Sequence, residues 1–134
     1  MGFAWPKCCR PLAGAMPDEA DARRFSDSWY AAWNRHDLDG IMAHYAEDVE
    51  HSSPFIARYN DDSECRPLKG KATVRDYFGR ALQRNPTLRF DPMHVGVGVD
   101  TVALVYRRMT GEVAVETFRL RDGLVEQSVS HYGA

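Results

Sequence analysis

The sequence predicts an α+β fold in which helices come first and an antiparallel sheet follows. Apolar residues recur with helical spacing across most of residues 18–85. A strand-like alternation at residues 49–55 interrupts this helical region. From Leu88 onward, four alternating runs are separated by turn residues, at about 88–99, 101–109, 113–121 and 124–132. Consecutive strands joined by short turns form an antiparallel meander.

The composition indicates one globular domain and excludes several classes of protein. A chain of 134 residues can form a single domain with a buried core. Lys and Arg number 17 against 19 Asp and Glu, so the net charge of −2 gives no sign of a nucleic-acid-binding surface. No apolar run approaches the ~20 residues that span a bilayer. We therefore expect partners other than nucleic acid and membranes.

Cysteine usage favours a cytoplasmic location. Cys8, Cys9 and Cys65 are odd in number and two of them are adjacent, which argues against a disulfide framework. They also lack the two spaced pairs of a zinc site, so we predict no metal. The segment GVGVD resembles part of a nucleotide-binding loop, but no helix follows it. No cofactor is predicted.

Residues 1–17 differ from the rest of the chain and are predicted to be a flexible N-terminal arm. The segment contains three prolines and no helical or strand period. Pro6, Lys7, Arg10 and Pro11 interrupt every candidate for the apolar segment of a signal peptide. An alternative is that Met16 is the true start. In either case residues 18–134 form the single predicted domain.

Three helices are predicted, each from one apolar face. The first begins near Asp18, the second follows Asp37 as its N-cap, and the third follows Gly70 and ends before Pro86. The three apolar faces contain Ala22, Phe25, Trp29, Ala32 and Trp33, then Leu38, Ile41, Met42 and Tyr45, then Val74, Tyr77, Phe78, Ala81 and Leu82. Residues 56–69 are predicted to be a long loop, of the kind that forms a lid or rim over a site.

His51 is the first candidate functional residue. Alternation places Val49, His51, Ser53 and Phe55 on one side of the predicted strand, so the histidine faces the core. With an ordinary pKa near 6.5, a histidine can exchange protons close to neutral pH.

Glu116 is the second candidate, because it shares a strand face with Ala114, Phe118 and Leu120. A buried carboxylate without a partner costs several kcal/mol, and pairing or protonation relieves that cost. Glu116 therefore has either a functional role or a structural one, bonded to the indole of Trp29, a tyrosine or a backbone N–H.

The last predicted strand ends in Ser130, His131 and Tyr132. Alternation allows only one of His131 and Tyr132 to face inward, and the pattern leaves open which one.

Three segments carry a family resemblance. They are AEDVEHSSPF after the second helix, GKATVRDYF at the third helix, and RDGLVEQ before the last strand. With the order of elements, they resemble the nuclear transport factor 2-like superfamily, in its SnoaL-like and ketosteroid isomerase-like branch. The resemblance implies a cone-shaped α+β barrel, in which three N-terminal helices pack in a curved, mostly antiparallel sheet around an apolar pocket.

The isomerase pattern, carried over by position, is incomplete in this chain. The position of its general-base aspartate holds Ser53, before Pro54, and the position of its pocket tyrosine holds Trp29. The position of its proton-bearing aspartic acid holds Glu116, which keeps a carboxyl group. The aspartate that SnoaL-like cyclases carry near the end of the last strand has no counterpart here. His51 is the substitute that the sequence offers for the missing base.

Two functional interpretations follow from the resemblance and the candidate residues. In the first, the protein is a cofactor-independent isomerase, cyclase or dehydratase, thus an isomerase or lyase, acting on an apolar cyclic molecule. His51 is then the general base, and Glu116 either orients His51 or, if protonated, donates to the oxygen of a developing enolate. The predicted substrate-binding residues are Trp29, Trp33, Tyr45, Ser53, Phe55, Tyr77, Phe78, Phe118, His131 and Tyr132. In the second, the protein is a non-catalytic ligand-binding or dimeric interaction module.

A homodimer is also predicted. Val113, Val115 and Thr117 lie on the strand face opposite Glu116, which should be the outer face of the sheet. Apolar residues on both faces of an antiparallel strand imply that both faces are covered. Relatives in the resembled family commonly pair through this outer face.

Overall fold

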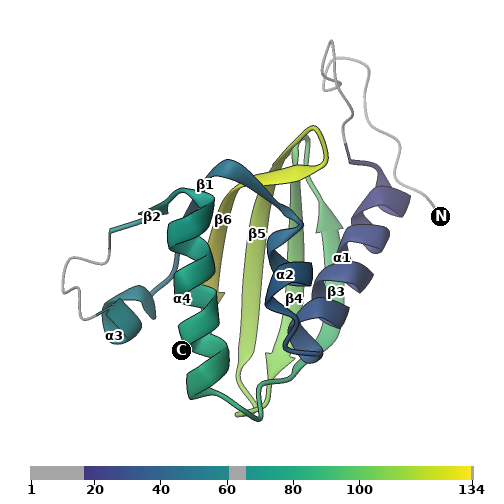
Figure 1. The fold of residues 1–134 in the computed structure, drawn as a ribbon. Coiled ribbons are helices and arrows are strands. Elements are labelled where there is room, and N and C mark those ends of the chain that lie inside the picture. Colours follow the sequence, from purple (N-terminus) through teal and green to yellow (C-terminus); the bar gives the residue numbers. More distant parts are fainter. Residues whose placement is uncertain (1–16, 61–65, 134) are drawn as a thin grey trace.

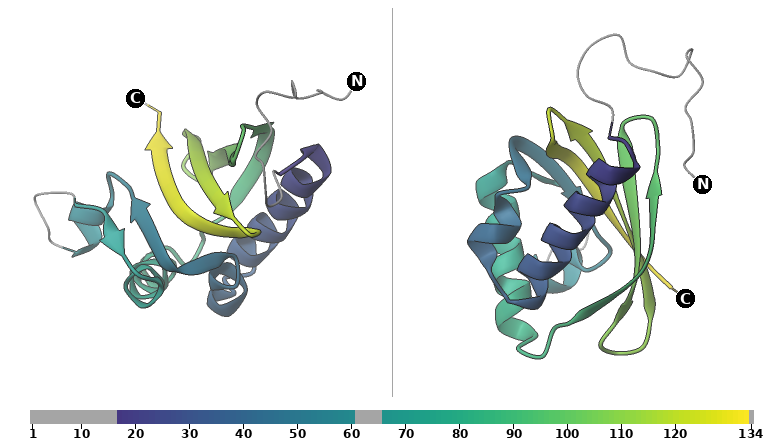
Figure 2. Two further views of the ribbon diagram at one scale, coloured as in Figure 1. Left: turned by 90° about the horizontal axis from the view of Figure 1, so that it is seen from above. Right: turned by 90° about the vertical axis from the view of Figure 1, so that its right-hand side faces the viewer.

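The computed structural model describes residues 17–60 and 66–133. Its helices lie on one side of a curved six-stranded sheet, as the views from above and from the side show (Figures 1 and 2). Most neighbouring strands are antiparallel. The predicted α+β class, with helices packed in a curved and mostly antiparallel sheet, is confirmed.

Helix α1 (Glu19–Asn34) begins where its capping residues predict. The Asp18 side chain accepts a hydrogen bond from the backbone N–H of Asp21, and the Asp21 side chain accepts one from the N–H of Asp18, which completes a capping box. Helix α2 (Leu38–Met42) is capped by Asp37, which accepts from the N–H of Gly40 at 3.0 Å. The predicted start of the first helix and the predicted N-cap of the second are both confirmed.

The sheet has the strand order β2-β1-β6-β5-β4-β3. The last four strands, joined by hairpins, match the four predicted runs within a few residues. The strands are β1 (Tyr45–Ser52), β2 (Leu68–Lys69), β3 (Phe90–Val97), β4 (Thr101–Arg108), β5 (Val113–Arg121) and β6 (Leu124–Tyr132). Strands β1 and β6 pair in parallel, which brings His51 opposite Ser128. The chain thus joins residues far apart in sequence at the centre of the sheet.

The β5–β6 hairpin turns at Asp122 and Gly123. Both residues have positive φ angles, 53° and 79°. A two-residue hairpin turn with positive φ at both central positions favours Asp-Gly, because its twist matches that of the flanking strands. The turn pairs Arg121 with Leu124, and a register shift of one residue between Arg119 and Leu120 then places Glu116 opposite Ser130.

The segment predicted to be a long loop contains two short elements. Helix α3 (Ile56–Asn60) forms a single turn, and β2 pairs with β1 through Glu50 opposite Lys69 and His51 opposite Leu68. A five-residue helix and a two-residue strand are too short to give a periodic pattern in the sequence. The loop prediction was therefore wrong for these residues, and the described parts of the chain contain four helices rather than the three predicted. Helix α4 (Lys71–Arg84) is the predicted third helix.

The position of Tyr45 differs from the prediction that it lies on the second helix. Its spacing from Leu38 and Ile41 suggested the face of the second helix, but α2 ends at Met42 and Tyr45 begins β1. Ala43 and His44 end the helix, and the hydrogen bond from the N–H of Val125 to the carbonyl of His44 brings the chain beside β6. The side chain of Tyr45 is nevertheless buried, as predicted.

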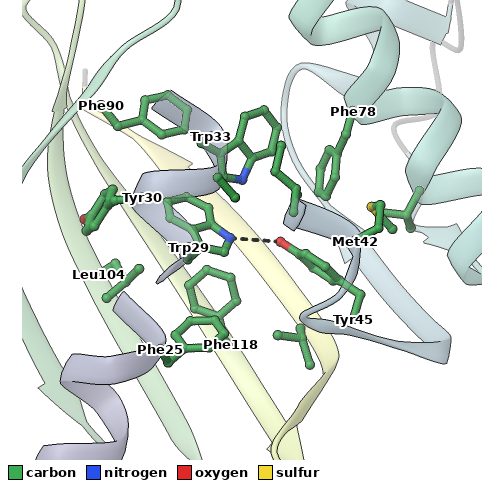
Figure 3. Packing of buried hydrophobic residues seen from close by; sticks show 14 of the residues in the cluster. Phe25, Trp29, Tyr30, Trp33, Met42, Tyr45, Phe78, Phe90, Leu104 and Phe118 are labelled. Atoms are coloured by element: carbon green, nitrogen blue, oxygen red, sulfur yellow. Dashed lines mark hydrogen bonds between the residues drawn. The ribbon is translucent and has the colours of Figure 1, made fainter. Parts of the chain in front are cut away.

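Trp29 lies at the centre of the hydrophobic core (Figure 3). Its ring stacks on Phe90, with centroids 5.7 Å apart, and meets Phe118 edge to face at 5.4 Å. Its indole N–H donates to the hydroxyl of Tyr45 at 3.1 Å, in a fully buried hydrogen bond. Ring contacts of this kind add to the stability that burial of aromatic area provides.

We expect the change Tyr45→Phe to lower the free energy of unfolding by about 1–3 kcal/mol, because it leaves the buried N–H of Trp29 without an acceptor. Urea unfolding followed by tryptophan fluorescence measures the change. The matched control is Tyr59→Phe, which removes a hydroxyl that accepts from Asn85 in a partly exposed position. An equal loss in the two variants would contradict the special cost assigned to the Trp29 donor.

The predicted arm lies almost entirely outside the described residues. No helix in the described parts of the chain is both long enough and apolar enough to cross a membrane.

Candidate functional site

A cavity lies between the inner face of the sheet and the helices. It offers about 60 Å³ for the centres of water-sized molecules. This is several times the roughly 10–15 Å³ that one water needs by the same measure. The lining residues are Trp29, Trp33, Tyr45, His51, Phe55, Tyr59, Tyr77, Phe78, Ala81, Asn85, Leu88, Phe90, Tyr106, Arg108, Glu116, Ser130 and Tyr132.

The cavity has a buried interior and a partly exposed rim. Its interior includes His51, Glu116 and the tryptophans, all of which are at most 5% exposed. We define the rim as the lining residues that remain partly exposed, namely Phe55, Tyr59, Asn85, Arg108 and Tyr132. A ligand would enter past the rim and reach His51 and Glu116 inside.

His51 lies on the same face of β1 as the buried Val49, two residues earlier, and this face is turned toward the cavity. Its Nδ1 lies 2.7 Å from Oγ of Ser128, its register partner on β6. Burial lowers the pKa of His51 to about 4, since the charged imidazolium is poorly solvated there. The imidazole is therefore neutral at pH 7. In the described parts of the chain its Nε2 has no recorded hydrogen bond, which leaves this nitrogen free to act on a ligand.

Glu116 reaches the same cavity from β5. The hydroxyls of Ser130 and Tyr106 both donate to its Oε1, the latter at 3.4 Å. Burial raises the pKa of Glu116 to about 7, and these two hydrogen bonds offset part of the rise. The carboxyl group can thus be protonated or ionised near neutral pH. No residue in the described parts of the chain donates a hydrogen bond to Oε2 of Glu116.

Trp33 contributes an unsatisfied donor to the cavity wall. Its Nε1 is buried and has no hydrogen-bond partner among the described residues. A buried donor without an acceptor costs about 1–3 kcal/mol. A ligand oxygen placed in the cavity would provide the missing acceptor.

Tyrosine hydroxyls surround the carboxyl group of Glu116. Burial raises the pKa of Tyr45 and of Tyr106, and the nearby Glu116 raises both further. Burial also raises the pKa of Tyr132 to about 12. These hydroxyls remain protonated at neutral pH, so they serve as neutral hydrogen-bond donors.

Comparison with known proteins identifies the family. A family model described as the SnoaL-like domain matches residues 27–127, which is most of the chain. The chain belongs to the SnoaL-like family. No curated protein matches it significantly.

Solved structures support the SnoaL-like assignment. A SnoaL-like protein of unknown function from Burkholderia thailandensis is 38% identical, with a TM-score of 0.84 over 90% of this chain and 100% of that one. TerC, crystallised with polyporic acid, is 18% identical, with a TM-score of 0.69 over 84% of this chain and 92% of that one. A candidate ketosteroid isomerase from Kribbella flavida is also 18% identical, with a TM-score of 0.69 over 90% and 83%. The last two similarities concern the fold alone.

Most of the site residues that were predicted from the sequence of this SnoaL-like chain line the cavity. Those found in its lining are His51, Glu116, Trp29, Trp33, Tyr45, Phe55, Tyr77, Phe78 and Tyr132. Their roles remain predictions. Ser53 is buried beside the cavity and does not line it; it accepts a hydrogen bond from the N–H of Phe55 at 3.1 Å.

Three expectations about the SnoaL-like site are corrected. Phe118 lies deeper in the core, against Phe25 at 4.9 Å, and does not line the cavity. His131 is exposed on the outer face of β6, so Tyr132 is the residue that faces inward. The indole of Trp29, one of the partners considered for Glu116, bonds Tyr45 instead, because β1 begins earlier than predicted and brings the Tyr45 hydroxyl closer. Another of the partners considered, a tyrosine, does bond Glu116, through the hydroxyl of Tyr106.

The sequence analysis also missed several polar cavity residues of this SnoaL-like chain. Tyr106 and Arg108 have the strand parity of Leu104, which is buried, so alternation along β4 could have placed them inward. Ser130 shares the parity of Tyr132, so its inward position follows only once the structure shows which face of β6 is buried. Nothing in the sequence pairs Ser128 with His51, since that contact depends on the parallel pairing of β1 and β6.

Proposed function

We propose that this protein is a cofactor-independent enzyme that acts by general acid–base chemistry on a small cyclic carbonyl compound, as an isomerase, cyclase or dehydratase. The observation that carries the proposal is the pairing of two buried titratable groups at one cavity. Burial displaces the pKa of Glu116 upward to about 7 and that of His51 downward to about 4. Strongly displaced pKa values in one cavity are typical of acid–base sites.

His51 is the proposed general base. If its Nδ1–H donates to Ser128, the lone pair of Nε2 is free to remove a proton from the carbon next to a ligand carbonyl. A weak base is sufficient when the enolate is stabilised. Ketosteroid isomerase, for example, uses an aspartate with a pKa of about 4.6 beside strong hydrogen-bond donors to the oxygen.

Glu116 is the proposed donor to that oxygen. In its protonated form it presents an O–H to the negative charge that develops on the carbonyl oxygen as His51 takes the carbon-bound proton. The unsatisfied N–H of Trp33 is a further donor on the cavity wall. Isomerisation is complete when His51 returns its proton to a different carbon and the carbonyl re-forms, while Glu116 keeps its own proton throughout.

Solvent deuterium incorporation tests this proposal directly. A panel of enolisable cyclic ketones of one to three rings is incubated in D₂O, and exchange at carbon is followed by NMR. We expect the wild-type protein to accelerate exchange for at least one compound. The control variant is His44→Gln, which removes a half-buried histidine that bonds Ser28 outside the cavity. Binding of panel members without any exchange would instead favour a non-catalytic ligand-binding module.

We also propose that the protein is a homodimer joined through the outer face of its sheet. Val115 and Thr117 on β5 lie beside Val105 and Ala103 on β4, and all four are only partly exposed. Val129 on β6 continues this patch next to Thr117. An apolar area that crosses three strands supports contact with a second copy.

Light scattering at micromolar concentration tests the dimer. We expect twice the chain mass for the wild-type protein, and the monomer mass for Val115→Asp, because a carboxylate in the centre of the apolar patch would be desolvated on pairing. Leu124→Asp, at the exposed first residue of β6, is the matched control and should remain dimeric. A monomeric wild-type protein would refute the proposal.

A further inference from the structure

Arg108 is a cation placed at the rim of the cavity. It is the last residue of β4 and lies on the inward face, two residues beyond Tyr106. Its side chain is 14% exposed. By contrast, Arg119 and Arg121, which form ion pairs on the surface, are 48% and 50% exposed. Arg108 is thus unusually sheltered for a charged side chain that closes a β-hairpin.

Two aromatic rings and one carboxylate fix the position of the Arg108 guanidinium. Its central carbon lies 5.1 Å from the ring centroid of Phe55 and 5.1 Å from that of Tyr132. These rings stack on each other, with centroids 4.2 Å apart. Nη1 donates to Oε2 of Glu112 at 2.7 Å, across the hairpin. Because the rings and the carboxylate hold it, the guanidinium would lose little conformational freedom when it binds a ligand.

Most of the hydrogen-bonding capacity of this guanidinium is unused. An arginine has five N–H donors, and only Nη1 has a recorded acceptor among the described residues. The planar fork of a guanidinium matches a carboxylate, which can accept two parallel hydrogen bonds. A ligand that entered past Phe55 and Tyr132 would meet these donors first.

The spacing between Arg108 and Glu116 limits the shape of such a ligand. Glu116 pairs with Leu104, which is four residues before Arg108 on β4. Four residues of strand span roughly 13 Å. The two side chains reach toward the cavity between them, so one or two rings can bridge the guanidinium and the carboxyl group.

We infer that the cavity selects a cyclic molecule that carries a carboxylate, with the carboxylate bound by Arg108 at the rim and the ring directed toward Glu116. This inference deepens the proposed function, on which it rests only in taking the cavity as the binding site. An acid of this kind is retained at the rim, while an uncharged ring of the same size lacks the ionic contact.

Calorimetric titration with matched acid and amide pairs tests the inference. The probes are benzoic, 2-naphthoic and biphenyl-4-carboxylic acids and the corresponding primary amides at pH 8. We expect the wild-type protein to bind at least one acid about 10- to 100-fold more tightly than its amide, as a charge-assisted hydrogen-bonded pair provides. Arg108→Gln should abolish this preference and leave amide affinity within about twofold.

Two further variants keep the test decisive if Arg108→Gln folds poorly. Arg107→Gln makes the same charge change at the neighbouring residue on the outer face of β4, and it should keep the acid preference. Glu112→Gln removes the exposed counter-ion of Arg108 without touching the cavity lining, and it should tighten acid binding but not amide binding.

Three outcomes would overturn the inference: equal binding of acid and amide by the wild-type protein, an acid preference that survives Arg108→Gln, or no binding of any acid at millimolar concentration. Turnover is a separate readout. An acid preference without carbon-proton exchange refutes the enzyme proposal and supports the carboxylate site. Exchange of neutral ketones without an acid preference supports the enzyme proposal and refutes the carboxylate site.

Discussion

Replacing His51 with glutamine is expected to slow carbon-proton exchange about 10²–10⁴-fold, the usual contribution of a positioned general base. Glu116→Gln should cause a loss of about 10²–10³-fold, because an amide N–H stabilises the developing enolate less well than a carboxylic acid. Both losses should appear in kcat more than in KM, since both groups act in the transition state. The assay uses whichever ketone the wild-type protein exchanges fastest.

The double variant separates joint action from independent action. If His51 and Glu116 serve one proton-transfer step, the double variant should be little slower than the worse single variant. The matched carboxyl control is Glu126→Gln, which removes a carboxylate bonded to Arg121 outside the cavity. Losses that multiply in the double variant would contradict joint action. Near wild-type rates for Glu116→Gln would make Glu116 a structural residue.

Stability should depend on pH in opposite ways in these two single variants. Folding raises the pKa of Glu116 from 4.5 to about 7, so the unfolded chain releases this proton first and stability falls as the pH rises through that interval. Folding lowers the pKa of His51 from 6.5 to about 4, so the unfolded chain gains this proton first and stability falls as the pH drops through that interval.

The two effects oppose each other in the wild-type protein. Each pKa unit corresponds to about 1.4 kcal/mol, so each group alone changes the free energy of unfolding by about 3 kcal/mol across its interval. Between pH 4.5 and 6.5 the two slopes cancel. Glu116→Gln should therefore expose the histidine slope and become more stable, relative to wild type, as the pH rises. His51→Gln should show the reverse.

Urea unfolding at pH 4.5, 5.5 and 6.5 measures both slopes against the wild-type curve, which cancels the contribution of all other titrating groups. His44→Gln is again the control. Burial lowers the pKa of His44 as well, so it tests whether a histidine outside the cavity gives the same slope. Curves for Glu116→Gln and His51→Gln that both run parallel to wild type would show that neither pKa is displaced.

The sequence predicted the framework of the site because periodicity reports which face of an element is buried. Alternation placed His51 with Val49 and Glu116 with Ala114, and both pairs do face inward. Helical spacing likewise placed Trp29 and Trp33 on the inner face of α1. These predictions depend only on the geometry of one element, so no knowledge of its neighbours was needed.

The bonding partners could not be obtained in this way. Trp29 bonds Tyr45 rather than Glu116 because the exact start of β1 sets which hydroxyl lies within reach. The choice between His131 and Tyr132 required the register of β6 against β5. The sequence of a strand shows that side chains alternate between two faces, but near the end of the strand it does not show which residues lie on which face. A shift of one residue there exchanges the two faces.

By itself, the sequence determined the α+β class, the helix caps, the inward histidine and the inward carboxyl group, since each follows from local spacing and side-chain chemistry. The tertiary structure alone decided that His51 is held by Ser128 and that Glu116 is held by Ser130 and Tyr106. These contacts join residues on different strands of the sheet. Their register is fixed by pairing across the whole sheet, and no local pattern encodes it.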